Sequence, residues 1–271
     1  MTSMKHLKLV LVIATLFAAS QTYAQQAPVT AATTMDINGK LWSSLWQQKA
    51  AEYRALCFQA YNIAHLRANQ ALLKRTKKPK AIITDIDETL LDNSPNAVSQ
   101  ALQGKGYEKA AWLNWTSKAE ADTVPGAPSF LKYAAKKGIA VYYITNRSEA
   151  ERASTLKNLQ KYGFPNADDA HLFLKTTSSS SKEDRRQLVL KTHEVIMLLG
   201  DNLGDFSALF DGKTVDERLA NTNAEVNKFG NQFIVLPNAN YGDWENSLYD
   251  YKYNLTPEQK EAILRKALKG E

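Results

Sequence analysis

The chain has 271 residues, of which 44% are hydrophobic, 10% aromatic and 23% charged. This composition is typical of a folded globular protein and excludes a disordered or fibrous chain, and the length suits one sizeable domain with a small appended part. The net charge is +6, but the lysines and arginines are scattered, so we find no footprint of nucleic-acid binding. A mild positive balance favours anionic small molecules as substrates.

The first 24 residues have the pattern of a secretory signal peptide. Lys5 and Lys8 accompany an apolar run over residues 7–19, and small and polar residues follow up to Ala24. The run is shorter than the roughly 20 residues that a membrane-spanning helix needs, although an uncleaved anchor is the alternative. No cysteine follows the run, so we predict a mature domain over residues 25–271, periplasmic or secreted, without a stable membrane anchor. The single cysteine, Cys57, excludes an internal disulfide and predicts a buried, inert thiol.

Apolar residues at helical spacing predict an N-terminal helical segment over residues 40–75, either one long helix or a helical pair. Short apolar runs and helical segments then alternate, which is typical of a parallel sheet with helices on both faces. A capping box with proline at the first helical position, Thr256-Pro-Glu-Gln259, begins a C-terminal helix over residues 256–268. The predicted strands are residues 81–84, 139–144, 171–174, 195–199 and 232–236.

Residues 93–127 interrupt this alternation. They contain two tryptophans and several glycines, and they separate the first strand from the helix predicted over residues 128–137. We therefore predict a core made of residues 80–92 and 128–240, with residues 93–127 as an inserted cap.

Polar residues follow the predicted strands where the strands end. Asp85 and Asp87 come after the first strand, Thr145 follows the second and Asp201 the fourth, while Lys182 opens a helix. In an open parallel sheet, the carboxyl ends of the strands form the edge at which ligands bind. A solvated acidic turn is the alternative for Asp85 and Asp87 alone. It does not explain why all five polar residues stand at the ends of predicted elements on the same edge of the sheet. We expect these side chains to share one site.

Carboxylates arranged in this way support metal binding and covalent catalysis. Asp85, Asp87 and Asp201 offer the oxygen ligands that Mg²⁺ prefers. One carboxylate of the first pair can attack phosphorus while the other moves a proton. Thr145 can donate a hydrogen bond to a phosphoryl group in transfer, and Lys182 can supply positive charge. The pattern predicts magnesium-dependent phosphoryl chemistry.

These motifs resemble those of the haloacid dehalogenase-like phosphatases. Asp85-Ile-Asp-Glu-Thr89 is similar to the first family motif, Thr145 lies in a run similar to the second, Lys182 resembles the third, and Gly200-Asp-Asn-Leu-Gly-Asp205 the fourth. The longer run from Asp85 to Pro95 resembles the class C acid phosphatases of the lipoprotein-e type, which include 5′-nucleotidases. The resemblance spans about residues 45–250. It implies an α/β fold with a Rossmann-like parallel sheet, helices on both faces, and a small, mainly helical cap.

The resemblance implies catalytic and metal-binding roles. Asp85 is expected to be the nucleophile that becomes an aspartyl phosphate, and Asp87 the acid that protonates the leaving oxygen and then activates water. Carboxylates of Asp85 and Asp201, with the main-chain carbonyl of Asp87, are expected to bind Mg²⁺. Asp205 is expected to hold a metal-bound water. An acidic pH optimum follows, because Asp87 must begin the reaction protonated.

Phosphate binding is expected from three further residues. Thr145 and Asn146 would contact phosphate oxygens, and Lys182 would offset the negative charge. Lys175, one residue past a predicted strand, is the alternative cation, but Lys182 precedes Asp201 at the spacing of the family. Arg147 is expected to contact substrate or to form a structural ion pair.

The leaving group is expected to be a nucleoside or an aryl ring. Class C members prefer nucleoside 5′-monophosphates and aromatic phosphomonoesters, whose rings stack on aromatic side chains. Trp112, Trp115 and Tyr241 are the candidates, although core packing is the alternative for both tryptophans because they share one helical face. Asn96 stands where the family often has an aromatic residue.

Two other functions fit the same scaffold. One is a catalytically idle ligand-binding or adhesion protein, which the intact set of Asp85, Asp87 and Asp201 disfavours. The other is a phosphotransferase, which would use the same aspartyl intermediate and which the sequence leaves open. The expected partner is a small-molecule phosphomonoester, with a homodimer as one candidate assembly.

Overall fold

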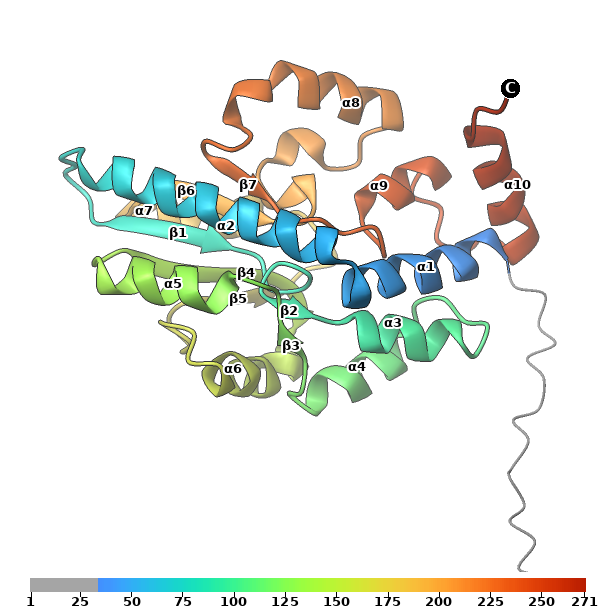
Figure 1. Ribbon diagram of the computed structural model, residues 1–271, viewed down its shortest axis with the longest axis horizontal. Coiled ribbons are helices and arrows are strands. Elements are labelled where there is room, and N and C mark those ends of the chain that lie inside the picture. The colour runs from blue at the N-terminus through green and yellow to red at the C-terminus, as the bar shows by residue number, and fades with distance from the viewer. Residues whose placement is uncertain (1–33) are drawn as a thin grey trace, which may run out of the picture. The chain divides into compact units, whose positions relative to one another are not determined.

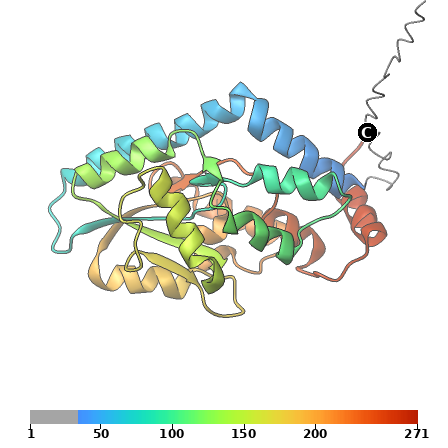
Figure 2. The same ribbon diagram turned by 90° about the horizontal axis from the view of Figure 1, so that it is seen from below.

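The computed structural model describes residues 34–271, so the predicted signal peptide lies outside the described residues. The described part begins with a helical pair, α1 (Met35–Lys49) and α2 (Ala51–Leu72), and Figure 2 shows the bend between them. Ala50 has an extended backbone (φ −76°, ψ 128°), which ends the first helix. Cys57 of α2 is fully buried, and burial raises the pKa of its thiol to about 11, as expected of an inert thiol.

Within residues 34–271, five parallel strands form the central sheet in the order β5-β4-β1-β6-β7 (Figure 1). Strand β1 pairs with β4 on one side and β6 on the other, so it lies at the centre of the sheet. The arrangement confirms the predicted fold class. The strands are β1 (Lys80–Thr84), β4 (Ala140–Ser148), β5 (Leu172–Lys175), β6 (Glu194–Gly200) and β7 (Phe233–Val235).

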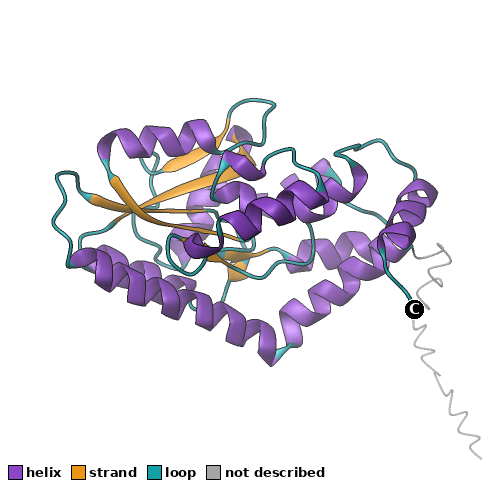
Figure 3. Cartoon of the chain, turned by 90° about the horizontal axis from the view of Figure 1, so that it is seen from above, coloured by secondary structure: helices purple, strands orange, loops and turns teal. Residues whose placement is uncertain are grey.

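Successive side chains of β1 point to opposite faces of the sheet, and helices cover each face (Figure 3). Ile82 lies in the larger apolar core, to which α2 and α5 (Ala127–Lys136) contribute. Ile83 lies in a smaller cluster with Val189 of α7 (Glu183–Thr192). Burial on both faces explains why β1 is an uninterrupted apolar run rather than an alternating one.

Residues 93–127 carry two helices, of which the first lies beside the N-terminal pair. Helix α3 packs against α1, and α4 packs against the helix that follows β4. The chain enters and leaves this segment through two very short antiparallel strands. The elements are β2 (Leu91–Asp92), α3 (Ser94–Ala101), α4 (Lys109–Ser117), β3 (Asp122–Thr123) and α6 (Arg152–Lys161).

The C-terminal helix follows its sequence signal closely. The side chain of Thr256 accepts the N–H of Gln259 and forms the predicted capping box of α10 (Pro257–Ala267). Helix α10 packs against α1. No helix in the described part of the chain is both long and apolar enough to cross a membrane. The remaining elements are α8 (Val215–Ala224), α9 (Asp243–Asn246) and the 3-10 turns 149–151, 203–205, 208–210, 226–228 and 247–249.

Candidate active site

The turn after β1 places two carboxylates at the carboxyl edge of the sheet. The N–H of Asp85 donates to the carbonyl of Leu199 in β6 at 2.9 Å, which ties the residue to the neighbouring strand. Ile86 is fully buried, and its carbonyl accepts the N–H of Leu90 at 2.8 Å. Glu88 has a left-handed backbone (φ 57°), which turns the chain back. The apolar residue between Asp85 and Asp87 thus anchors a turn that exposes the two acids to one cleft.

Lys182 connects the first and fourth motifs. It lies at the N-cap of α7, is buried, and forms ion pairs with Oδ1 of Asp85 and, at 2.6 Å, with Oδ1 of Asp205. Burial alone would lower the pKa of Lys182, but Asp205 and Asp85 raise it above its ordinary value, so the side chain is a cation. Lys175 has no such contact among the described residues, and the geometry selects Lys182 as the cation beside Asp85.

Three carboxylates converge beside this lysine. Oxygens of Asp85, Asp201 and Asp205 all lie within 4.8 Å of one another. Asp201 accepts hydrogen bonds from Thr89 Oγ1 at 3.1 Å and from Asn238 Nδ2 at 2.7 Å. These bonds orient the carboxylate toward the cluster.

The electrostatics of the cluster fit a cation. Burial raises the pKa of Asp85 to about 7, with Lys182 opposing the shift and the Asp205 carboxylate adding to it. Burial, followed by Asp205 and Asp85, raises the pKa of Asp201 well above its usual range. Lys182 is a single positive charge among three carboxylates. Oxygen donors with this excess of negative charge suit a hard divalent cation.

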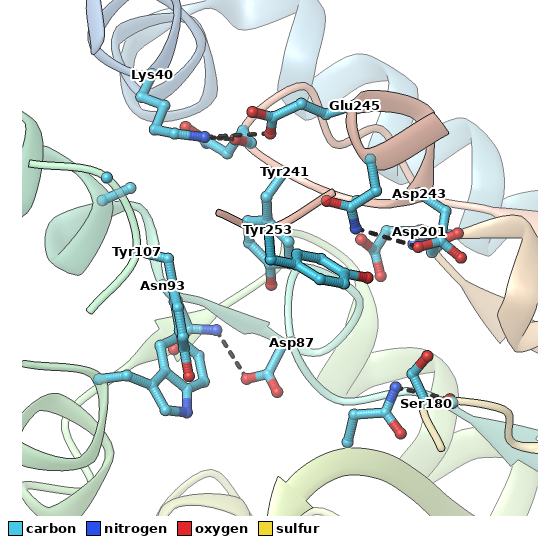
Figure 4. Close-up of a pocket in the computed structure, with 18 of the residues that line it drawn as sticks. Lys40, Asp87, Asn93, Tyr107, Ser180, Asp201, Tyr241, Asp243, Glu245 and Tyr253 are labelled. Carbon is cyan, nitrogen blue, oxygen red and sulfur yellow. Dashed lines mark hydrogen bonds and ion pairs between the residues drawn. The ribbon is translucent and has the colours of Figure 1, made fainter. Parts of the chain in front are cut away.

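Asp87 points to a different set of partners. Its Oδ1 accepts from Arg147 at 2.7 Å and from Asn93 Nδ2 at 2.9 Å, and its Oδ2 accepts from Thr145 Oγ1 at 3.4 Å. Figure 4 shows the bond between Asn93 and Asp87. Arg147 is almost wholly buried and forms an ion pair with Asp87, but it also lines the cleft, so contact with substrate stays a prediction.

The two tryptophans of α4 support this arrangement through their indole N–H groups. Trp115 Nε1 donates to Asn93 Oδ1 at 2.8 Å, and the side chain is not among those that line the cleft. The indole N–H of Trp115 thus orients Asn93 and its ring packs against the core, while stacking on substrate stays a prediction. Trp112 does line the cleft, but its Nε1 donates to Glu151 Oε1 at 2.8 Å.

A cleft of about 580 Å³ opens over these residues. Tyr107, Tyr241 and Tyr253 line it (Figure 4), and the side chains of Tyr107 and Tyr253 are largely exposed. The Tyr241 hydroxyl donates to Glu88, whose pKa burial raises to about 8. Asn96 also lines the cleft but is mostly buried.

Sequence reasoning missed several of these residues. Asn93 and Glu88 lie within the run from Asp85 to Pro95, so their polar side chains next to the motif could have marked them as site residues. Tyr107 and Tyr253 come from loops without periodic pattern, so no signal pointed to them.

Comparison with known proteins places these features in a family. The model of HAD superfamily, subfamily IIIB (acid phosphatase), matches residues 3–244. Two structures of the class C acid phosphatase from Bacillus anthracis, one with tungstate bound, are each 42% identical to this chain, with TM-scores of 0.84 and 0.83. The tungstate structure aligns over 88% of this chain and 99% of its own, and the other over 87% and 99%.

A curated relative is more distant. Acid phosphatase 1 of Solanum lycopersicum is 26% identical over 131 residues, which are 45% of this chain and 50% of the relative, so the match spans half of that protein's length. The family model nevertheless matches a range that contains every residue of the site described above from Asp85 to Tyr241. The chain therefore belongs to the haloacid dehalogenase superfamily, subfamily IIIB, the acid phosphatases.

Proposed function

We propose that the protein is an exported, magnesium-dependent acid phosphatase that hydrolyses phosphomonoesters through an aspartyl phosphate on Asp85. The observation that carries the proposal is the position of this carboxylate, paired with the buried Lys182 and adjacent to Asp201 and Asp205. A nucleophile, a fixed cation and a cation-binding carboxylate cluster are the parts that phosphoryl transfer through aspartate requires.

The residues of the chain divide the chemical work. Asp85 attacks phosphorus, and Lys182 offsets negative charge on the nucleophile and on the transferring group. Asp87 gives its proton to the leaving oxygen and then takes one from the attacking water, while Arg147 and Asn93 hold its carboxyl group in place. Because Asp87 must begin protonated, activity should peak below neutral pH.

The metal proposal rests on the carboxylate cluster. Asp85 and Asp201 would hold Mg²⁺ with the main-chain carbonyl of Asp87, and Asp205, already paired with Lys182, would hold a water of the ion. When bound, the cation supplies charge neutralisation at the phosphate oxygens and the nucleophile.

Thr145 and Asn146 are proposed to bind phosphate. Both follow the regular part of β4 at the carboxyl edge, and Asn146 lines the cleft. For the leaving group we propose nucleoside 5′-monophosphates and aryl phosphates, because Tyr241, Tyr107 and Trp112 offer aromatic surface to the cleft. Export to the periplasm or the medium is proposed from the signal-like pattern of residues 1–24.

The decisive experiment compares three forms of the protein with an aryl phosphate as substrate. The wild type should release phosphate with Mg²⁺ and stop when EDTA is added. Asp85→Asn should lose turnover while circular dichroism shows a folded protein. Asp216→Asn, an exposed acid of α8 outside the cleft, is the matched control and should keep the wild-type rate. Full activity of Asp85→Asn would refute the assignment, and an inactive wild type would favour an idle binding protein.

A panel of nucleoside 5′-monophosphates, 3′-monophosphates and sugar phosphates then tests the proposed leaving group. A preference for aromatic leaving groups is expected, and equal kcat/KM values across the panel would contradict it.

A further inference from the structure

Arg185 donates hydrogen bonds to three oxygens, two of which belong to the residues proposed to bind phosphate. It lies in the first turn of α7, three residues after Lys182. Its NH1 donates to the carbonyl of Thr145 at 2.6 Å, and its NH2 donates to Asn146 Oδ1 at 2.7 Å and to the carbonyl of Ser181 at 3.0 Å. All three acceptors are uncharged. The guanidinium thus joins the end of β4 to the loop that precedes α7.

The contact with Asn146 dictates how that side chain is turned. A guanidinium has donors only, so Asn146 must present its amide oxygen to Arg185 and its NH₂ group elsewhere. The NH₂ group donates to the carbonyl of Ser180 (labelled in Figure 4) at 3.0 Å, and both Asn146 and Ser180 line the cleft. Without Arg185, the amide could rotate and turn its oxygen toward a bound anion, which an acceptor would repel.

The neighbouring arginine has a different environment. Arg186 is buried, pairs with Glu183 at 2.6 Å, and donates to the carbonyls of Gly204 and Asp205 at 2.7 and 2.9 Å. Its charge is balanced within its own helix. No carboxylate lies within ion-pair distance of Arg185 in the part of the chain that the structure describes. Arg185 and Arg186 therefore tie α7 to the second and fourth motifs, respectively, and of the two only Arg186 forms an ion pair among the described residues.

We propose that Arg185 is a positioning residue of the phosphate site, which turns the amide oxygen of Asn146 away from the substrate phosphate so that the second hydrogen of the NH₂ group, the one not bonded to Ser180, can be donated to it. The proposal rests on the proposed function, because it requires that phosphate binds beside Asn146. Arg185 belongs to none of the four motifs named above.

The test is a double-mutant cycle with two readouts, kcat/KM for an aryl phosphate and the rise in melting temperature that inorganic phosphate causes in the presence of Mg²⁺. Arg185→Ala should lose about tenfold in kcat/KM and in phosphate affinity, the size expected for charge-assisted hydrogen bonds. Arg185→Lys should not restore the loss, since a point charge cannot span two acceptors. In an Asn146→Ala background, Arg185→Ala should cost no more than about twofold.

The control is Gln187→Ala, an exposed position on the same helix, which should behave as the wild type. An equal tenfold loss in both backgrounds, or wild-type behaviour of Arg185→Ala, would overturn the proposal. If Arg185→Ala does not fold, Arg185→Lys in the two backgrounds provides the same comparison. The phosphate-induced shift separates the two proposals: it reports on Arg185 even if the wild type hydrolyses no phosphomonoester.

Discussion

Replacement of Gly200 by alanine should damage the site through a single steric overlap. Gly200 ends β6, and a Cβ atom built on it would lie 2.5 Å from both Cβ and Oδ2 of Asp205. Non-bonded carbon atoms pack at about 3.5 Å or more. Gly200→Ala must therefore move the Asp205 side chain by about 1 Å.

That movement affects two contacts that position the cluster. Asp205 Oδ2 accepts the N–H of Asn202 at 3.0 Å, and Oδ1 pairs with Lys182 at 2.6 Å. Overpacking of this kind costs about 1–3 kcal/mol, and each kcal/mol lowers the melting temperature of a domain of this size by about 2–4 °C. Misplacement of catalytic groups by about 1 Å can reduce the rate about 100-fold, so we expect a loss in kcat of that order.

Thermal melting and steady-state kinetics with an aryl phosphate measure both effects. Gly39→Ala in α1 is the matched control, because a Cβ atom there meets nothing within 4 Å. The control should gain about 0.5–1 kcal/mol of stability from the better helix former, with kcat unchanged. If Gly200→Ala keeps the melting temperature and kcat of the wild type, the Asp205 side chain can move aside without cost, and its exact position does not matter for catalysis.

Three further perturbations test the supports of the two acids. Trp115→Phe removes the donor to Asn93 and should cost about 1 kcal/mol, measured by urea unfolding, with a lower kcat and unchanged KM; an unchanged kcat would separate Asn93 from catalysis. Arg147→Met leaves Asp87 without its ion pair and should destabilise the fold by about 3 kcal/mol in the same assay; a loss below about 1 kcal/mol would contradict this. Mg²⁺ at about 100 times its Kd should stabilise the wild type by about 2.7 kcal/mol, and Asp201→Asn should abolish the shift; an undiminished shift would place the ion elsewhere.

The sheet and the motif residues could be predicted because strand ends are readable in the sequence. Asp85, Thr145 and Asp201 each follow a short apolar run, and parallel pairing brings the ends of such runs to one edge. The choice between Lys182 and Lys175 needed more than this, because Lys175 ends the same strand that Lys182 follows. Only the turn into α7 brings one of them, Lys182, to Asp85.

Contacts that depend on how the segment 93–127 packs could not be predicted. Trp112 and Trp115 share a helical face, which suggested a common role. In the structure, the first lines the cleft and donates to Glu151, while the second donates to Asn93. Residues three apart on a helix differ in height by about 4.5 Å, enough to give the two indoles different partners. The spacing carries no information on which partner each indole meets.

The hydrogen bonds around Asp85 and Asp87 favour the proposed division of roles, with Asp85 as nucleophile and Asp87 as acid–base group. In the part of the chain that the structure describes, the side chain of Asp85 has Lys182 as its hydrogen-bond partner, whereas Asp87 has Arg147, Asn93 and Thr145. A nucleophile must move toward phosphorus, and a single lysine contact can follow that movement. An acid–base group must stay aligned with one leaving oxygen, and a carboxyl group fixed from three sides meets that need. If the roles were exchanged, attack by Asp87 on phosphorus would break its hydrogen bonds to the buried guanidinium of Arg147. The transition state would then lose the stabilisation that these bonds give.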